Sequence, residues 1–112
     1  MPMSDDSSIT VLELAELLKS QPQICLIDVR EPEEHALASI SGSELIPLST
    51  LPAQTHRWSL EQPIYVHCKA GGRSARAVQF LKTQGFTQAT NVSGGMDAWL
   101  EEGLPVSKDD AE

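Results

Sequence analysis

One short segment of the chain carries residue types that could do chemistry, the stretch YVHCKAGGRSAR at residues 65–76. A short apolar run ends at Cys68, two glycines follow, and the basic residues Lys69, Arg73 and Arg76 come close behind. Backbone N–H groups that converge at a helix N-terminus bind anions, and such surroundings also lower the pKa of a cysteine thiol. The segment therefore predicts an anion-binding loop in which Cys68 is a thiolate nucleophile.

A second interpretation of Cys68 stays open from the residues alone, in which it is a small packed side chain beside a turn. A catalytic pair with His67 is not evident, because adjacent residues of a strand point to opposite faces of the sheet. We expect His67 and His35 to be structural or exposed, and His56 has no predicted role.

The elements that would position this loop alternate between strand and helix patterns. Apolar runs predict buried strands at 24–29, 63–67 and 89–92, with a brief strand in 42–48. Helical patterns are found at 10–20, 30–38, 74–85 and 96–103, and the segment 48–58 has room for only a short helix beside its proline. This alternation predicts an α/β domain with a mainly parallel sheet between helices. Cys68 would then lie at the carboxyl end of a strand, where such sheets bind ligands.

Length and charge bound the class of protein. The 112 residues fit one domain, and we expect it to span residues 9–106 between flexible ends at 1–8 and 107–112. No apolar run approaches the roughly 20 residues that cross a bilayer, and the N-terminal residues lack a signal-peptide pattern, so a cytoplasmic location is expected. A net charge of -8 disfavours nucleic acid and anionic membranes as partners.

The two cysteines lack the spacing of a metal site or a redox pair. Cys25 and Cys68 form no Cys-x-x-Cys motif and no zinc-ligand cluster, so we expect no metal, no cofactor and no disulfide scaffold. Cys25 lies within the apolar run ICLIDV and is interpreted as a small buried side chain.

Four segments together resemble the rhodanese domain of single-domain sulfurtransferases, over residues 9–106. They are LIDVREPEEH at 26–35, SGSELIPLS at 41–49, VHCKAGGRS at 66–74 and NVSGGMDAWLEEGLPV at 91–106. Their motifs look closest to the rhodanese domains fused to adenylyltransferases of sulfur carrier proteins. The resemblance implies a rhodanese-like three-layer sandwich, with a five-stranded, mostly parallel sheet flanked by helices.

The resemblance also implies a reaction and a set of site residues. Cys68 would take sulfane sulfur from thiosulfate or a protein persulfide, hold it as a persulfide, and pass it to cyanide or a thiol. Asp28 and Arg30 would brace the loop. The persulfide and the donor oxyanion would be bound by the residues after the nucleophile, Lys69, Ala70, Gly71, Gly72 and Arg73.

Loop length separates this chemistry from a related one. Phosphatases of similar architecture have a loop of the pattern Cys-x5-Arg, whereas this chain has four residues between Cys68 and Arg73. The shorter loop favours the transfer of sulfur over the binding of a phosphate group. An alternative function is a binding module that presents a persulfide to a dedicated protein partner in sulfur-cofactor or tRNA thiolation pathways. A non-catalytic regulatory domain is disfavoured by the presence of Cys68.

Two segments depart from the pattern of the family. Many members read GHIPGA where this chain reads ASISGS at residues 38–43, and Lys69-Ala70 replaces a residue followed by serine. Both departures leave the nucleophile in place, and we expect them to bear on the choice of sulfur donor.

Overall fold

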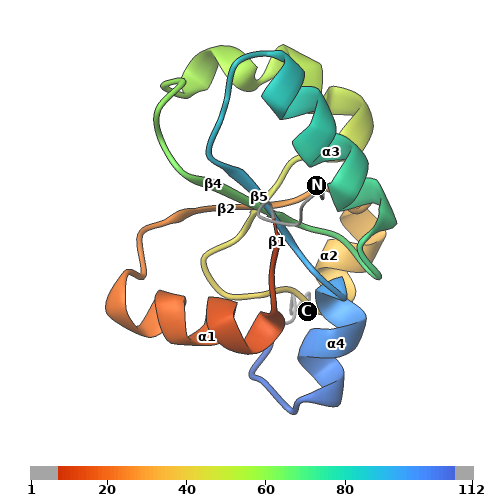
Figure 1. Ribbon diagram of the computed structural model, residues 1–112. Helices are drawn as coiled ribbons and strands as arrows, with labels where there is room; N and C mark the ends of the chain where they lie inside the picture. Colours follow the sequence, from red (N-terminus) through yellow and green to blue (C-terminus); the bar gives the residue numbers. More distant parts are fainter. Residues whose placement is uncertain (1–7, 108–112) are drawn as a thin grey trace.

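The computed structural model describes residues 8–107, in which strands and helices alternate along the chain (Figure 1). The strands are β1 (Ser8–Ile9), β2 (Cys25–Asp28), β3 (Glu44–Leu45), β4 (Ile64–His67) and β5 (Ala89–Val92). The helices are α1 (Val11–Ser20), α2 (Pro32–Leu37), α3 (Gly72–Thr83) and α4 (Gly95–Glu101), and the 3-10 helices are η1 (Leu48–Ala53) and η2 (Thr55–Arg57). The predicted α/β class is confirmed.

The strands form one sheet in the order β1-β5-β4-β2-β3, and every pair of neighbours is parallel. Cys25 is in register with Ile64, and Asp28 is in register with His67. Because parallel strands end at the same edge, the residues that follow Asp28 and His67 emerge side by side at the carboxyl edge of the sheet. The backbone N–H of Val29 donates to the His67 carbonyl at 3.1 Å, which fixes this edge.

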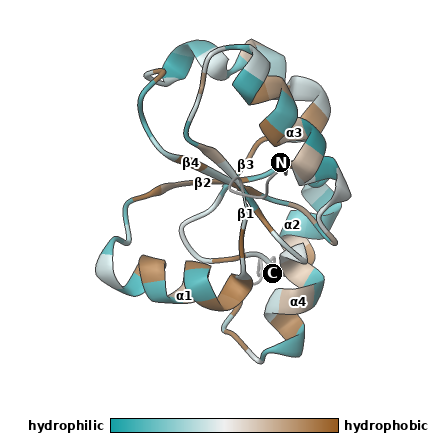
Figure 2. Ribbon diagram, in the orientation of Figure 1, coloured by the Kyte–Doolittle hydropathy of each residue, from teal (hydrophilic) through white to brown (hydrophobic). Residues whose placement is uncertain are grey.

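Helices cover both faces of the sheet, which makes three layers. In Figure 1, α3 and the 3-10 helices lie on one side of the strands, and α1 and α4 lie on the other. The colours of α1 and α3 alternate between hydrophobic and hydrophilic in Figure 2, as expected of helices with one face on the sheet. In α1 the buried residues are Val11 and Leu14, and in α3 the buried apolar residues are Ala77, Val78 and Leu81.

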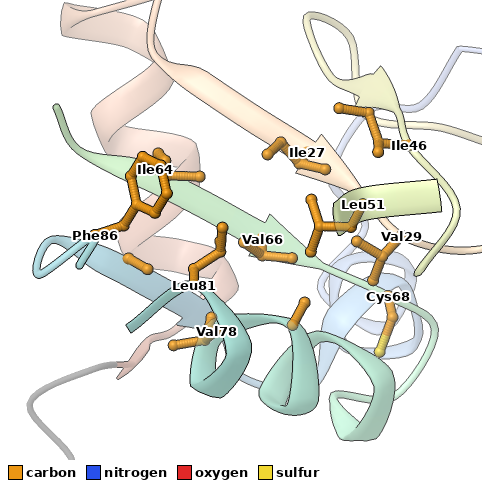
Figure 3. Close-up of a cluster of buried hydrophobic side chains, with 12 residues drawn as sticks. Ile27, Val29, Ile46, Leu51, Ile64, Val66, Cys68, Val78, Leu81 and Phe86 are labelled. Atoms are coloured by element: carbon orange, nitrogen blue, oxygen red, sulfur yellow. The ribbon is translucent and has the colours of Figure 1, made fainter. Parts of the chain in front are cut away.

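The two faces of the sheet pack into separate hydrophobic clusters. Along β4, Ile64 and Val66 belong to the cluster under α3, whereas Tyr65 packs against the cluster under α1 and α4. Cys68 belongs to the cluster of Ile64 and Val66 (Figure 3). Alternation along the strand therefore directs Cys68 toward the α3 side.

The first helix begins where the sequence predicted. The backbone N–H of Glu13 donates to the Thr10 hydroxyl at 3.1 Å, and the Thr10 N–H donates to the Glu13 carboxylate at 2.8 Å. This reciprocal pair is a capping box, and it satisfies two N–H groups at the start of α1.

Each of the two ends that the sequence predicts to be flexible contains one residue that is hydrogen-bonded to the rest of the domain. Ser8, which we had placed in a flexible end, pairs with Asn91 of β5, because β5 has a free edge that accepts a short parallel strand. Ser107, assigned to the other flexible end, exchanges two backbone hydrogen bonds of 2.8 Å with Ser39. The rest of both predicted ends, residues 1–7 and 108–112, lies outside the described residues.

Helix length bears on membrane insertion. Within residues 8–107, no helix has the length and apolar character that crossing a membrane requires. The domain bounds 9–106 and the cytoplasmic location stay predictions.

Candidate active site

Cys68 lies directly after β4, at the carboxyl edge of the sheet, and only 1% of the residue is exposed. Its side chain packs in the same cluster as Val29 and Val66, and its sulfur points toward α3 (Figure 3). This position agrees with the interpretation of Cys68 as a small packed side chain. Its sulfur also accepts hydrogen bonds, which packing alone does not explain.

Three donors point at the Cys68 sulfur. They are the backbone N–H of Gly71 at 3.0 Å, the backbone N–H of Ser74 at 3.3 Å and the Ser74 hydroxyl at 3.3 Å. Burial alone would raise the pKa of the thiol, but the Ser74 hydroxyl and the N–H groups of Ser74, Gly71 and Ala70 outweigh it, so the pKa of Cys68 is lowered. Donors placed in this way favour the thiolate over the thiol, and the role of Cys68 as a nucleophile stays a prediction.

Gly71 turns the chain from the loop into α3. It is the N-cap residue of that helix and has a φ of 114°, in the left-handed region that favours glycine. Gly72 has an ordinary backbone conformation and is the first residue of the helix. Of the two adjacent glycines, only Gly71 needs its conformational freedom here, and it is also the one whose N–H reaches the sulfur.

The N-terminus of α4 holds the other side of the loop. The Met96 N–H donates to the Cys68 carbonyl at 2.8 Å, and the Asp97 N–H donates to the Lys69 carbonyl at 2.9 Å. In a trans peptide the C=O and the following N–H point in opposite directions. A Lys69 carbonyl fixed on α4 therefore turns the Ala70 N–H away from α4 and toward the sulfur.

Gly95 makes this contact between α4 and the loop possible. A Cβ atom at this position would lie 2.3 Å from the Cys68 carbonyl oxygen and 2.7 Å from the Lys69 carbonyl oxygen, and the φ of Gly95 is 54°. Any side chain here would push α4 away from the loop, so the close approach depends on glycine.

Ser74 links the Cys68 sulfur to β5. Besides the sulfur, its hydroxyl oxygen lies 2.5 Å from Asn91 Oδ1 and 3.2 Å from the Gly71 carbonyl. A hydroxyl has one hydrogen to donate, so the acceptors around Ser74 compete for it. Ser74 is fully buried, and its position next to Cys68 makes it part of the candidate site.

The two basic side chains of the predicted binding loop are paired with carboxylates. Arg73 donates to both oxygens of Glu34, at 2.8 and 3.0 Å, and the Lys69 ammonium lies 3.1 Å from Asp97. In the sequence these basic residues come close behind Cys68 without an acidic neighbour. In the structure, acidic residues distant in sequence neutralise the two cations.

Asp28 and Arg30 form a buried cluster beside the loop. The Arg30 guanidinium donates to both carboxylate oxygens of Asp28 at 2.8 to 3.1 Å, and His35 Nδ1 lies 2.8 Å from the same carboxylate. Burial opposes ionisation of Asp28, but the hydrogen bonds from Arg30 and His35 and the charge of His67 lower its pKa. Arg30 also donates to the Glu34 and Ala38 carbonyls, so its contacts fix α2 rather than the Cys68 loop itself.

His67 supports the loop from inside the sheet. Its side chain is fully buried, and its Nδ1 lies 3.2 Å from the Cys68 carbonyl, which can only accept, so Nδ1 carries the hydrogen. Burial lowers the pKa of His67, against the opposing effect of Asp28. Although His67 and His35 both lie near Asp28, no group of three metal-binding side chains in residues 8–107 could hold a metal ion.

A match to a family model decides which proteins the chain is related to. The model described as the rhodanese-like domain matches residues 10–102. The chain belongs to the rhodanese-like domain family. The family suspected from the four sequence segments is therefore confirmed.

Two relatives of known name match most of the chain. The chain is 29% identical over 93 residues to a protein named sulfurtransferase from Allochromatium vinosum, covering 83% of this chain and 87% of that protein. It is 38% identical over 101 residues to the probable adenylyltransferase/sulfurtransferase MoeZ of Mycobacterium tuberculosis. The second match covers 88% of this chain but only 26% of MoeZ, so it relates the chain to one part of that protein.

Solved rhodanese-like structures have the same fold. A rhodanese-like domain protein from Staphylococcus aureus is 37% identical, with a TM-score of 0.80 over 91% of this chain and 99% of that one. A human single-domain sulfurtransferase is 31% identical, with a TM-score of 0.76 over 88% of this chain and 98% of that one. These likenesses confirm the predicted three-layer architecture.

Proposed function

We propose that this rhodanese-like protein is a sulfurtransferase that carries sulfane sulfur as a persulfide on Cys68. The observation that carries the proposal is the set of N–H and O–H donors around a buried sulfur, which lowers the pKa of the thiol. The names of the Allochromatium and human relatives support sulfur transfer as the reaction class.

With thiosulfate as donor, the Cys68 thiolate attacks the outer, sulfane sulfur. A new S–S bond forms to Cys68, the bond between the sulfane sulfur and the sulfonate sulfur breaks, and sulfite leaves with the bonding pair. The outer sulfur of the Cys68 persulfide anion then takes up the negative charge. The N–H groups of Ala70 and Gly71, which are directed at the Cys68 sulfur, would stabilise that charge, as donors in an anion-binding loop do.

The second half of the reaction returns the enzyme to its starting state. An acceptor such as cyanide attacks the outer sulfur, the S–S bond to Cys68 breaks, and the Cys68 thiolate leaves with the bonding pair while thiocyanate is released. The same donors that stabilise the thiolate make it a good leaving group. A thiol, including that of a protein acceptor, would take the sulfur in the same way.

The other predicted site residues act by holding the loop or the approaching donor. We assign the backbone of Lys69 to Arg73 to binding of the persulfide and the donor. Asp28 and Arg30 act at a distance, since Arg30 fixes α2 and α2 carries the Glu34 that pairs with Arg73.

Access to the sulfur requires movement, because only 1% of Cys68 is exposed. Lys69 and Ala70, the two residues that follow Cys68, are both exposed, so a donor meets the loop at these residues. The closed loop then keeps water away from the persulfide.

The test is a thiosulfate:cyanide assay on the wild type, Cys68→Ala and Cys25→Ala. Removal of Cys68 is expected to reduce thiocyanate formation by on the order of 10³-fold or more, the scale seen when a covalent nucleophile is removed. Cys25→Ala, the matched control, should keep nearly full activity. Full activity of Cys68→Ala would overturn the assignment of the nucleophile.

A further inference from the structure

A doubly negative donor would bind best beside unpaired positive charges, but the cations nearest Cys68 are paired with carboxylates. Lys69 and Arg73 both follow Cys68 closely in the sequence, yet Asp97 pairs with Lys69 and Glu34 pairs with Arg73. Arg76, the next cation along, lies almost one turn further into α3 and is exposed. The two cations nearest the nucleophile therefore contribute little net positive charge to an incoming anion.

The ion pair between Glu34 and Arg73 is bidentate. Two nearly parallel N–H···O bonds of 2.8 and 3.0 Å join the groups, the geometry in which arginine binds a carboxylate most strongly. Arg73 and the other neighbours lower the pKa of Glu34 to about 2, so the carboxylate is ionised at neutral pH. The side chains of Arg73 and Glu34 are 34% and 29% exposed, so a donor at the loop can reach the pair.

A second set of contacts holds Glu34 in this place. Its carboxylate also accepts the Glu31 N–H at 2.8 Å, and its backbone carbonyl accepts from the Arg30 guanidinium, which is anchored on buried Asp28. These contacts hold Glu34 on α2 with its carboxylate against the Arg73 guanidinium. A donor sulfonate would have to displace this carboxylate in order to bind Arg73.

We propose that Glu34, by occupying and neutralising Arg73, selects against doubly charged small donors such as thiosulfate and in favour of a persulfide carried by a thiol. This inference rests on the proposed sulfur transfer through Cys68. Thiosulfate carries two negative charges and must approach both the Cys68 thiolate and Glu34. A thiol persulfide carries at most one, and its outer sulfur needs no cation for binding.

The favoured step balances without a further reactant. The Cys68 thiolate attacks the outer sulfur of the neutral form R–S–S–H, and the new S–S bond forms as the old one breaks. The thiolate R–S⁻ leaves with the bonding pair, and Cys68–S–S–H remains in the loop. Arg73 takes no part in this step, so its pairing with Glu34 costs the reaction nothing.

The experiment compares two donors on one pair of variants. Glu34→Gln keeps an oxygen for the Glu31 N–H but removes the charge, and Glu16→Gln removes an exposed carboxylate of α1 as the matched control. Loading of sulfur onto Cys68 is followed by intact mass, with thiosulfate or the persulfide of 2-mercaptoethanol as donor, and the concentration for half-maximal loading is measured.

For Glu34→Gln we expect the half-maximal concentration of thiosulfate to fall about tenfold, while that of the 2-mercaptoethanol persulfide stays the same. The gain should shrink at high salt, where charges are screened, and it should vanish in Glu34→Gln combined with Arg73→Ala. Glu16→Gln should match the wild type with both donors.

Two failures are distinguishable. An unchanged or higher half-maximal thiosulfate concentration in folded Glu34→Gln, with Cys68 still loaded, overturns the role of Glu34 alone. Failure of the wild type to load Cys68 from either donor overturns the proposed function as well.

Discussion

The two cysteines of this protein lie at opposite edges of the sheet. The more deeply buried of the two has the lowered pKa, which is the reverse of what burial alone would cause. Cys25, at the amino end of β2, is only partly buried, and its pKa is raised by burial and then by the charge of Glu44. Cys68, after the carboxyl end of β4, is almost fully buried, yet its pKa is lowered. The comparison shows that the hydrogen-bond donors around Cys68 outweigh the effect of its burial on the pKa, whereas for Cys25 the effect of burial prevails.

The direction of the strands explains where the donors are. In this parallel sheet, the chain leaves the carboxyl edge at Cys68 and enters α3 within a few residues, so free N–H groups of a helix start gather there. In the described part of the chain, no helix begins beside Cys25 at the amino edge, and the charge of Glu44 on β3 adds to the effect of burial in raising the pKa of Cys25, against Arg57 and Gln62. Two chemically identical side chains thus have pKa values shifted in opposite directions.

The largest expected effect comes from separating α4 from the loop at the carboxyl edge. Gly95→Ala places a Cβ against two backbone carbonyls, so we expect it to lower the free energy of unfolding by about 3 kcal/mol or more. Gly103→Ala is the matched control, because Gly103 also has a positive φ but open space around it, and about 1 kcal/mol is expected. Urea unfolding measures both, and equal losses would show that the close approach is unimportant.

A smaller effect is expected from removing one donor from the sulfur. Ser74→Ala deletes the hydroxyl but keeps the backbone N–H, so it should raise the pKa of Cys68 and leave that of Cys25 unchanged. The rate of Cys68 alkylation at pH 7 should fall roughly tenfold, since a hydrogen bond to a charged acceptor contributes about 1.5–3 kcal/mol.

The measurement for Ser74→Ala is iodoacetamide labelling across a pH series, with the two cysteines resolved by peptide mass spectrometry. In the wild type, Cys68 should reach half of its maximal rate at a lower pH than Cys25. The pH midpoint is used because it does not depend on how easily the reagent enters the loop. Identical Cys68 midpoints in wild type and variant would refute the role of the hydroxyl.

The smallest effect concerns acid stability of the Glu34–Arg73 pair. The pKa of Glu34 is about 2 in the folded protein against an ordinary 4.5, so the unfolded state binds more protons between these values. The stabilisation is therefore present above about pH 4.5 and is lost as the pH falls toward 2. For a partly exposed pair we expect about 1 kcal/mol.

Unfolding of wild type and Glu34→Gln at pH 6 and pH 3 tests this expectation. The stability difference between the two proteins should narrow at pH 3. A constant difference would mean that the ion pair does not contribute.

The sequence predicted those parts of the protein that depend on neighbours in the chain. The buried runs of β2, β4 and β5 and the helical patterns of α1 and α3 are local, and the structure has each of these elements where the sequence predicts it. The strand Ser8–Ile9 was missed, because a two-residue strand has no pattern of its own and forms only through its pairing with β5.

The missed site residues are those that long-range contacts bring in. Glu34 meets Arg73 across 39 positions, and Asn91 meets Ser74 across 17, so no spacing in the sequence signals either contact. Glu34 is also one of three glutamates in the stretch EPEE, which reads as a solvated acidic turn. For Ser74 a signal did exist, its place beside Arg73 at the start of a predicted helix, where a hydroxyl can reach the loop.

The central claim is that Cys68, and not Cys25, carries transferable sulfur. Its most direct test is the intact mass of the protein after exposure to a sulfur donor, followed by peptide mapping of the product. The account predicts one added sulfur atom, located on Cys68 and removed by cyanide. An added sulfur on Cys25, or none on Cys68 with either thiosulfate or a thiol persulfide, would contradict it.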